Sequence, residues 1–496
     1  MKKKLKKAIK AELNDSQKVY TKIDRYFSKL NEKYCPLGDV PDKIRDTGDN
    51  FICFGKKDGY PVGHKAGLDG HGAVFGGSGT GKTSKFAVPT LLTWKGAMVC
   101  TDIKGEMSDW YRFFRCNKWV HRKMIVFDPE DENCPRYDPF VLIAKYPNDK
   151  IAIISSIVLI LIPTKDGAFL EYNFWTKSAQ TFLKAALLYR YNCNDSFIDA
   201  IKYIQTTSIT ELLHEIKKYD AEASEIIGDS IEKNVYLLSS IDIDIHNALE
   251  VFCDPYISKA FDRDSTPNNK ILTWDMVNTY NIFLKLPSEK IIHWKPVFNI
   301  MYSQLIFTLN KRKEKYSYGG ENNMQTLLLM DEFASFGKIP GFEKDISTLR
   351  SKSVNIFIIL QSLAQLDRIY GEDIRKEIMD NCCHNLILGC NDNDTRKYFS
   401  ELIGTHDELK FSLNTTFSNG SRCLSRTVAK EKVVTIEPHE LGALEDIIVI
   451  SEGHPYRLEK FELSPKLYRE YKILQMMRQN PQIMAIAGRN YYGNNK

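Results

Sequence analysis

The sequence contains a run of glycine, lysine and threonine residues with the spacing of a phosphate-binding loop. Positions 76–83 read Gly-Gly-Ser-Gly-Thr-Gly-Lys-Thr and match G-x-x-x-x-G-K-[ST]. Glycines let successive backbone N–H groups turn toward phosphates, and a lysine there reaches the β- and γ-phosphates of ATP. The alternative is a glycine-rich turn before an ordinary helix. We predict that nine consecutive residues hold the nucleotide: Gly76, Gly77, Ser78, Gly79, Thr80, Gly81, Lys82, Thr83 and Ser84.

An acidic pair follows a second apolar run. Residues 326–330 read Thr-Leu-Leu-Leu-Met, and Asp331 and Glu332 come next. Acids of this kind also occur at helix N-termini. Downstream of a phosphate-binding loop they instead indicate a Walker B strand, whose first acid holds Mg²⁺ and whose second polarises the attacking water. We therefore predict a Mg²⁺ site at Thr83 and Asp331, with Glu332 and Lys82 as catalytic residues.

Two polar residues flank the next apolar run, residues 354–360. Gln361 follows it, at the position where RecA-like motors keep a γ-phosphate sensor. Arg350 precedes it, and a guanidinium there can pair a carboxylate or reach the nucleotide of a neighbouring subunit. We predict catalytic roles for both residues. For Arg350 the alternative is an ion pair within the chain, to Glu343 or Asp345.

The elements that position these residues alternate between strands and helices, which predicts an α/β domain. The expected strands are Ala73–Phe75, Gly96–Thr101, Arg122–Phe127, Asn281–Leu286, Thr326–Met330, Val354–Leu360, Asn385–Leu388 and a final strand, Ile447–Ile450. The expected helices are Ser84–Thr93, Val297–Asn310, Phe342–Lys352, Asp394–Leu402 and a terminal helix over 465–479. We expect residues 411–432 to form an exposed loop or an irregular hairpin.

Residues 148–275 have a different pattern. Apolar and aromatic residues recur there at helical spacing, and strand signals almost vanish. We expect an all-α domain inserted between two halves of the α/β domain. Its aromatic residues fit a helical core, and the alternative is that they stack on single-stranded bases.

Composition sets broad limits. The chain has 496 residues, 43% of them hydrophobic, and a net charge of +5, which by itself does not argue for nucleic acid. The first ten residues contain six lysines, and a basic helix of this kind can lie on an anionic membrane or a phosphate backbone, or simply be solvated. The longest apolar run, Ile151–Ile162, is shorter than the roughly 20 residues of a membrane span, so we expect a core helix there and no transmembrane anchor.

Taken together, the motifs resemble those of the coupling ATPases of type IV secretion and conjugation, the TraG/TraD-like proteins of the FtsK–HerA group. The resemblance covers about residues 50 to 465 and depends on the order of the motifs. They are the phosphate-binding loop with its lead-in from His71, Thr101-Asp102-Ile103-Lys104-Gly105-Glu106, Phe174-Trp175, Leu329-Met330-Asp331-Glu332-Phe333, Leu360-Gln361-Ser362 with Gln365-Leu366, Pro438-His439-Glu440-Leu441 and Gly453-His454-Pro455.

The resemblance implies a RecA-like P-loop NTPase core with an inserted all-α domain, working as a homo-hexamer with ATP and Mg²⁺. It places Lys82 and Thr83 in the P-loop, and Asp331 and Glu332 in Walker B. Gln361 becomes the sensor, and Arg350 an arginine acting in trans. We accordingly divide the chain into a basic N-terminal segment (1–50), the two halves of the nucleotide-binding domain (51–147 and 276–465), the helical insert (148–275) and a C-terminal helix and tail (466–496).

The implied function is an ATPase that receives a relaxase–DNA complex and drives single-stranded DNA into a type IV secretion channel. The alternative is a receptor for secreted protein effectors that uses ATP for unfolding or release. Members of this family usually carry an N-terminal membrane anchor, which is not apparent here. We therefore expect a cytoplasmic protein at the inner face of the cell membrane. Either a partner supplies the anchor, the gene is shortened, or the subclass is soluble.

Overall fold

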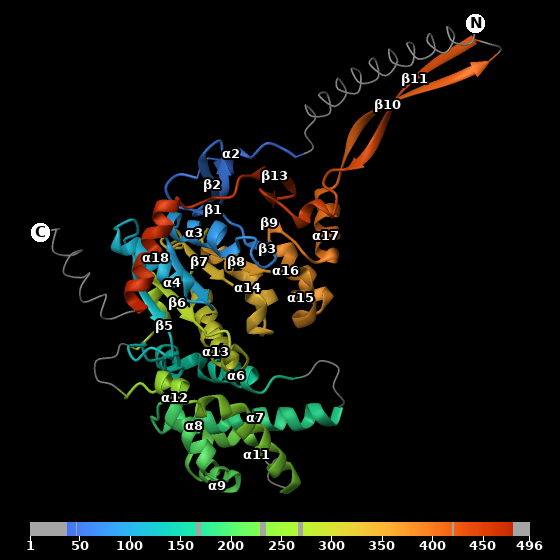
Figure 1. Ribbon diagram of the computed structural model, residues 1–496. Coiled ribbons are helices and arrows are strands. Elements are labelled where there is room, and N and C mark those ends of the chain that lie inside the picture. Colours follow the sequence, from blue (N-terminus) through green and yellow to red (C-terminus); the bar gives the residue numbers. More distant parts are fainter. Residues whose placement is uncertain are drawn as a thin grey trace, which may run out of the picture.

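The computed structural model describes residues 37–45, 47–164, 170–228, 235–265, 271–418 and 421–479. The predicted basic helix before residue 37 and the tail after residue 479 lie outside these ranges. A layered α/β body occupies the upper part of Figure 1, and a bundle of helices lies below it.

The α/β body is built on one nine-stranded sheet with the strand order β13-β12-β9-β3-β8-β7-β4-β6-β5. The seven strands from β9 to β5 in this order are parallel, and β12 and β13 are antiparallel additions at one edge. The bounds are β3 (Gly72–Gly76), β4 (Ala97–Asp102), β5 (Lys123–Phe127), β6 (Tyr280–Lys285), β7 (Thr326–Met330), β8 (Val354–Leu360), β9 (His384–Gly389), β12 (Ile447–Ser451) and β13 (His454–Leu458).

The central strands are apolar on both faces because helices cover both faces, as is usual for parallel sheets. In β3, Val74 points into one hydrophobic core, and Ala73 and Phe75 point into the other. One face is covered by α3 (Val88–Thr93), α4 (Glu106–Cys116) and α18 (Pro465–Gln479). The other is covered by α13 (Ile291–Asn310), α14 (Phe342–Thr348), α15 (Leu363–Tyr370), α16 (Glu372–Asn381) and α17 (Asn393–Ile403).

Between β5 and β6, the described part of the chain is helical, as predicted. The helices are α5 (Phe140–Lys145), α6 (Lys150–Leu161), α7 (Leu170–Asn192), α8 (Phe197–Thr206), α9 (Ile209–Tyr219), α10 (Ala221–Ile227), α11 (Val235–Leu249) and α12 (Pro255–Phe261). Side chains at Ser196, Ser208 and Asp220 cap the starts of α8, α9 and α10. Phe182 is buried in the core as expected, whereas Phe174 is 57% exposed.

The predicted elements are present, with four differences. Ile447–Ser451 is not the final strand, because β13 follows it and pairs with it along the sheet edge. The helix predicted from Val297 begins six residues earlier, at Ile291, and runs through Pro296. The helix after the phosphate-binding loop opens with a π-helical stretch, Lys82–Ala87.

The fourth difference is a long hairpin. Strands β10 (Thr405–Ser418) and β11 (Ser421–Val434) pair residue by residue from Thr405 with Val434 to Ser418 with Ser421. The hairpin is regular, and it projects from the body in Figure 1. A shorter hairpin, β1 (Phe51–Lys57) with β2 (Tyr60–Lys65), precedes β3.

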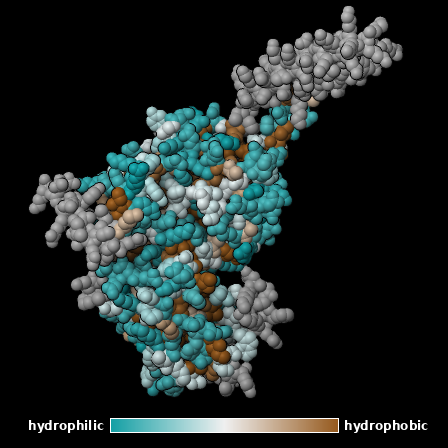
Figure 2. All heavy atoms as spheres, in the orientation of Figure 1, coloured by the Kyte–Doolittle hydropathy of each residue, from teal (hydrophilic) through white to brown (hydrophobic). Residues whose placement is uncertain are grey.

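The described helices include none with the length and apolar character needed to cross a bilayer. The apolar helix α6 is a core helix, since Ile153, Ile154 and Ile157 are at most 1% exposed. On the face in Figure 2, hydrophobic residues lie in small groups among hydrophilic ones.

Candidate nucleotide site

The strand order brings the predicted site residues to one edge of the sheet. Strands β3, β8, β7 and β4 are neighbours in that order and run parallel. The phosphate-binding loop follows β3, Gln361 follows β8, and Asp331 follows β7. Ligands in open α/β sheets bind outside the carboxyl ends of the strands. The motifs that lie far apart in the sequence therefore meet where such ligands bind.

The phosphate-binding loop has a backbone that depends on its glycines. Gly81 has φ of +97°, a region that favours glycine, and a Cβ on Gly76 would lie 2.3 Å from Thr80 Oγ1. The Thr80 hydroxyl donates to the Gly77 carbonyl over 2.9 Å, and the Gly77 N–H donates to the Gly389 carbonyl at the end of β9. The first bond closes the loop, and the second connects it to β9, a neighbour of β3 in the sheet.

Lys82 is folded over this loop. Its Nζ donates to the carbonyls of Gly76 (2.6 Å) and Gly77 (3.0 Å). Burial lowers the pKa of Lys82, and the carboxylates of Asp331 and Glu332 oppose that change. A cation held among neutral carbonyls is well suited to an anionic ligand such as a phosphate.

Asp331 is buried among other acids. Burial raises its pKa to about 7, with further contributions from Glu332 and Asp102. Two hydrogen bonds hold its backbone turn, from the Thr101 hydroxyl to the Asp331 carbonyl (3.2 Å) and from the Glu332 N–H to Asp331 Oδ1 (3.1 Å). A divalent cation bound there would stabilise the charged form of this carboxyl, and carboxylate oxygens are ligands that Mg²⁺ prefers. The site therefore fits Mg²⁺.

Asp102 caps the start of the helix α4. Its carboxylate accepts hydrogen bonds from the N–H groups of Met107 (3.2 Å) and Ser108 (2.8 Å), in the first turn of α4. It thus holds the start of this helix, and it adds negative charge near Asp331.

Glu332 adopts the left-handed conformation, with φ of +46°. This is uncommon for a residue with a side chain and is often found at functional sites. A small cavity is lined by Lys82, Glu332, Gln361 and Gln365, among others. The structure thus brings three of the four predicted catalytic residues together.

Arg350 is not part of this group. It lies in a 3₁₀ turn, Leu349–Lys352, at the amino end of β8, whereas Lys82 follows the carboxyl end of the parallel strand β3. The seven residues of β8 span roughly 23 Å at about 3.3 Å each. Arg350 is exposed, and among the described residues it forms no ion pair with Glu343 or Asp345. Its charge instead helps to lower the pKa of Asp69.

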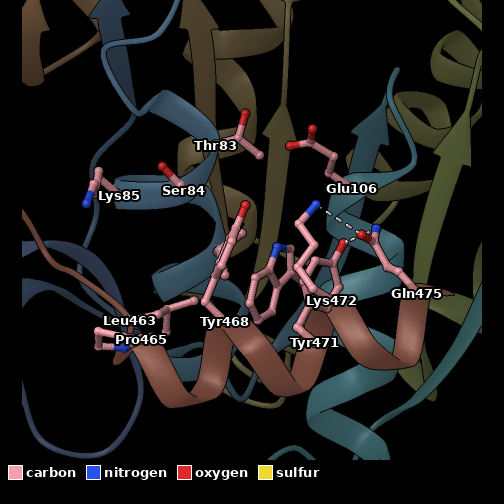
Figure 3. Close-up of a pocket in the computed structure, with 12 residues that line it drawn as sticks. Thr83, Ser84, Lys85, Glu106, Leu463, Pro465, Tyr468, Tyr471, Lys472 and Gln475 are labelled. Atoms are coloured by element: carbon pink, nitrogen blue, oxygen red, sulfur yellow. Dashed lines mark hydrogen bonds between the residues drawn. The ribbon is translucent and has the colours of Figure 1, made fainter. Parts of the chain in front are cut away.

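One wall of the site has no counterpart among the residues predicted from the sequence. A pocket of mixed polarity lies beside the phosphate-binding loop and is lined by residues of that loop, of α4 and of α18. Figure 3 shows Tyr468, Tyr471 and Lys472 of α18 on the side of this pocket opposite Thr83 and Ser84. The spacing of Tyr468, Tyr471 and Gln475 predicts that the three side chains share one face of a helix. Nothing in the sequence indicates that this face packs beside the phosphate-binding loop.

Comparisons with known proteins agree with this arrangement. The sequence model of the family described as "Type IV secretory system Conjugative DNA transfer" matches residues 28–481. The chain is 22% identical to VirD4 of Agrobacterium fabrum over 404 residues (78% of this chain, 57% of VirD4) and 21% identical to a conjugal transfer protein TraG of Escherichia coli (78% of this chain, 66% of TraG). It therefore spans little more than half the length of VirD4.

Among solved structures, the coupling protein TrwBdeltaN70 shares the fold. Its unbound form superposes with a TM-score of 0.62, covering 86% of this chain and 96% of that one at 17% identity. TrwB in complex with ADP and Mg²⁺ gives a TM-score of 0.58, covering 79% and 85% at 17% identity. At such identities the likeness establishes the RecA-like fold alone.

Proposed function

This chain belongs to the family of conjugative DNA transfer proteins of type IV secretory systems, and we propose that it hydrolyses ATP to drive single-stranded DNA into the secretion channel. The proposal depends on one observation. Lys82, Glu332 and Gln361 line the same small cavity, beside the buried Asp331. A site that only bound nucleotide would not need a carboxylate and an amide facing the γ-phosphate.

Bound ATP with Mg²⁺ supplies a γ-phosphoryl group that water can attack. The Lys82 ammonium and backbone N–H groups of the loop other than that of Gly77 bind the phosphates. Thr83 and Asp331 would hold Mg²⁺, an ion with which TrwB is known in complex together with ADP. Glu332 orients the attacking water and accepts its proton, and the Gln361 amide contacts the γ-phosphate.

Arg350 completes the site from a neighbouring subunit in this proposal. Its position at the amino edge of the sheet puts it about a strand length from its own phosphate-binding loop. It is exposed and free of an ion pair to the nearby acids of α14 within the described residues. A homo-hexameric ring would bring this edge to the next subunit's nucleotide, where a guanidinium can neutralise charge on the γ-phosphate.

The remaining parts of the proposal come from the family. The DNA arrives with its relaxase, and the motor docks on components of the type IV channel. With these contacts, the chain would act at the inner face of the cell membrane.

The ATPase rate with and without single-stranded DNA tests the proposal. We expect DNA to stimulate turnover, and we expect the stimulation to fade between about 50 and 200 mM salt, because phosphate contacts release counterions. Turnover that responds to effector proteins and not to DNA would instead favour the receptor. The absence of any turnover would reject both.

A further inference from the structure

The pocket between the phosphate-binding loop and the C-terminal helix has the composition of a nucleoside site. It is lined on one side by Thr83, Ser84 and Lys85, and on the other by α18 and by Trp110 of α4. We infer that α18 supplies the subsite for the base and ribose of the bound nucleotide, with Tyr468 as the stacking residue. The inference deepens the proposed function, because it assumes that the phosphates lie in the loop at residues 76–84.

The position of the pocket follows from the direction of the loop. A P-loop holds the β- and γ-phosphates near its lysine, so the α-phosphate and nucleoside extend past the residues that follow the lysine. Thr83, Ser84 and Lys85 are those residues, and each of them lines the pocket. A nucleoside that leaves the loop in this direction enters the space facing α18.

The floor of the pocket is aromatic and rigid. Trp110 and Tyr471 are stacked, with ring centroids 3.7 Å apart and an angle of 12° between the planes. Trp110 is 5% exposed and Tyr471 is 3% exposed. The stack fixes α18 against α4, which holds the neighbouring Tyr468 in place.

Tyr468 is the exposed aromatic side chain of the pocket, and Lys472 Nζ lies 5.6 Å from the centroid of its ring. Tyr468 is 49% exposed, and its ring lies tilted at 6.2 Å from Trp110. Figure 3 shows it reaching from α18 toward Thr83 and Ser84. An exposed aromatic ring beside a phosphate-binding loop is the surface on which a flat base stacks.

One ion pair connects this wall to the helix after the loop, and two hydrogen bonds within the wall limit which polar groups can recognise the base. Lys85, in the helix after the loop, forms an ion pair with Glu462, just before α18. On the wall itself, Lys472 Nζ donates to Gln475 Oε1 (3.2 Å), and Gln475 Nε2 donates to the Tyr471 hydroxyl (2.6 Å). Because these polar groups are bonded to one another, stacking dominates recognition, and it tolerates different bases.

The test measures the binding of two ligands to the full chain by titration calorimetry with Mg²⁺. ADP carries the base and ribose, whereas tripolyphosphate carries neither. We expect Tyr468→Ala to weaken the binding of ADP by roughly 5- to 150-fold, the range given by the loss of one base stack, and to leave the binding of tripolyphosphate unchanged. Tyr468→Phe keeps the ring and should bind ADP like the wild type, and GDP should bind within about tenfold of ADP.

Ile473→Ala is the matched control, because Ile473 is 50% exposed on the same helix but does not line the pocket. Unchanged ADP binding by Tyr468→Ala, or equal weakening of both ligands, would overturn the subsite. Tighter ADP binding by Tyr468→Ala would also overturn it, since α18 would then obstruct the site. Lys82→Ala separates the two proposals: if it binds both ligands normally, the phosphate site itself is wrong, whatever Tyr468 does.

Discussion

Lys104 and Glu332 lie 3.7 Å apart, measured from Nζ to Oε1, and they join the loop after β4 to the turn after β7. The side chains are 60% and 27% exposed, so the pair adds at most about 1 kcal/mol to stability. The ion pair instead orients the Glu332 side chain, because Glu332 has a left-handed backbone conformation and lines the cavity beside Lys82. The glutamate that we expect to position water is thus held by a lysine of a second motif.

The first prediction separates binding from hydrolysis. Lys82→Ala removes a cation that faces the phosphates, so we expect both nucleotide affinity and turnover to fall. Glu332→Gln keeps the shape of the side chain but removes the base, so ATP should stay bound while turnover falls by about 10²- to 10⁴-fold. Calorimetry and phosphate release measure the two properties. Equal loss of ATP binding in both variants would rule out the role given to Glu332.

The second prediction concerns Mg²⁺ and pH. Because burial raises the pKa of Asp331 to about 7, this carboxyl is partly protonated at neutral pH, and Mg²⁺ must displace the proton. The affinity for Mg²⁺-nucleotide should therefore fall below pH 7, by up to about tenfold per pH unit. Calorimetry in buffers of different ionisation enthalpy measures the released proton. Asp331→Asn is the control, and the same proton release in that variant would assign it elsewhere.

The third prediction concerns three buried histidines at the amino edge of the sheet. Burial lowers the pKa of His64 and of His71 to about 4, and lowers that of His384 well below its ordinary value of 6.5. The histidines of the unfolded chain bind protons more readily than those of the folded chain. Their contribution to the free energy of unfolding is therefore fully present above pH 6.5 and is lost as pH falls toward 4. Each of the first two histidines contributes up to about 3 kcal/mol, since a tenfold change in proton affinity is about 1.4 kcal/mol.

Four carboxyls oppose this trend, because burial raises the pKa of Asp102 and Asp138 as well as those of Asp331 and Asp345. Burial and nearby acids raise the pKa of Asp331 and of Asp345 to about 7, so the folded chain gains stability as they protonate. Urea unfolding at pH 7.5, 6 and 5 should therefore be measured in a variant in which these four aspartates are replaced by asparagine. A free energy of unfolding that stays constant or rises on acidification there would contradict the histidine account.

The fourth prediction concerns assembly. Arg350→Ala and Lys82→Ala proteins, each inactive alone, should regain part of their ATPase activity when mixed under ring-forming conditions. Some mixed interfaces would then join an intact Arg350 to an intact phosphate-binding loop, where an arginine finger is worth about 10³ to 10⁵ in rate. Mixtures that co-assemble without any recovery would count against action in trans. Lys352→Ala, a change at a nearby basic residue paired with Glu314, is the control.

Much of the fold and site was predictable because its signals are local. The phosphate-binding loop, the Walker B strand and the strand before Gln361 are short runs whose residue types specify both structure and position. Strand β13 was missed because it is an edge strand with a proline, Pro455, and only partial burial. The helix α18 was predicted, but its contact with the phosphate-binding loop was not, because packing between segments almost 400 residues apart has no local signal.

Displacement of streptavidin from a biotinylated oligonucleotide tests whether this site powers movement along single-stranded DNA. We expect displacement that needs ATP and Mg²⁺, is lost in Glu332→Gln, and is retained in Ile473→Ala. A wild-type chain that assembles on the oligonucleotide and hydrolyses ATP but leaves streptavidin in place would rule out such movement, and so would equal displacement by Glu332→Gln.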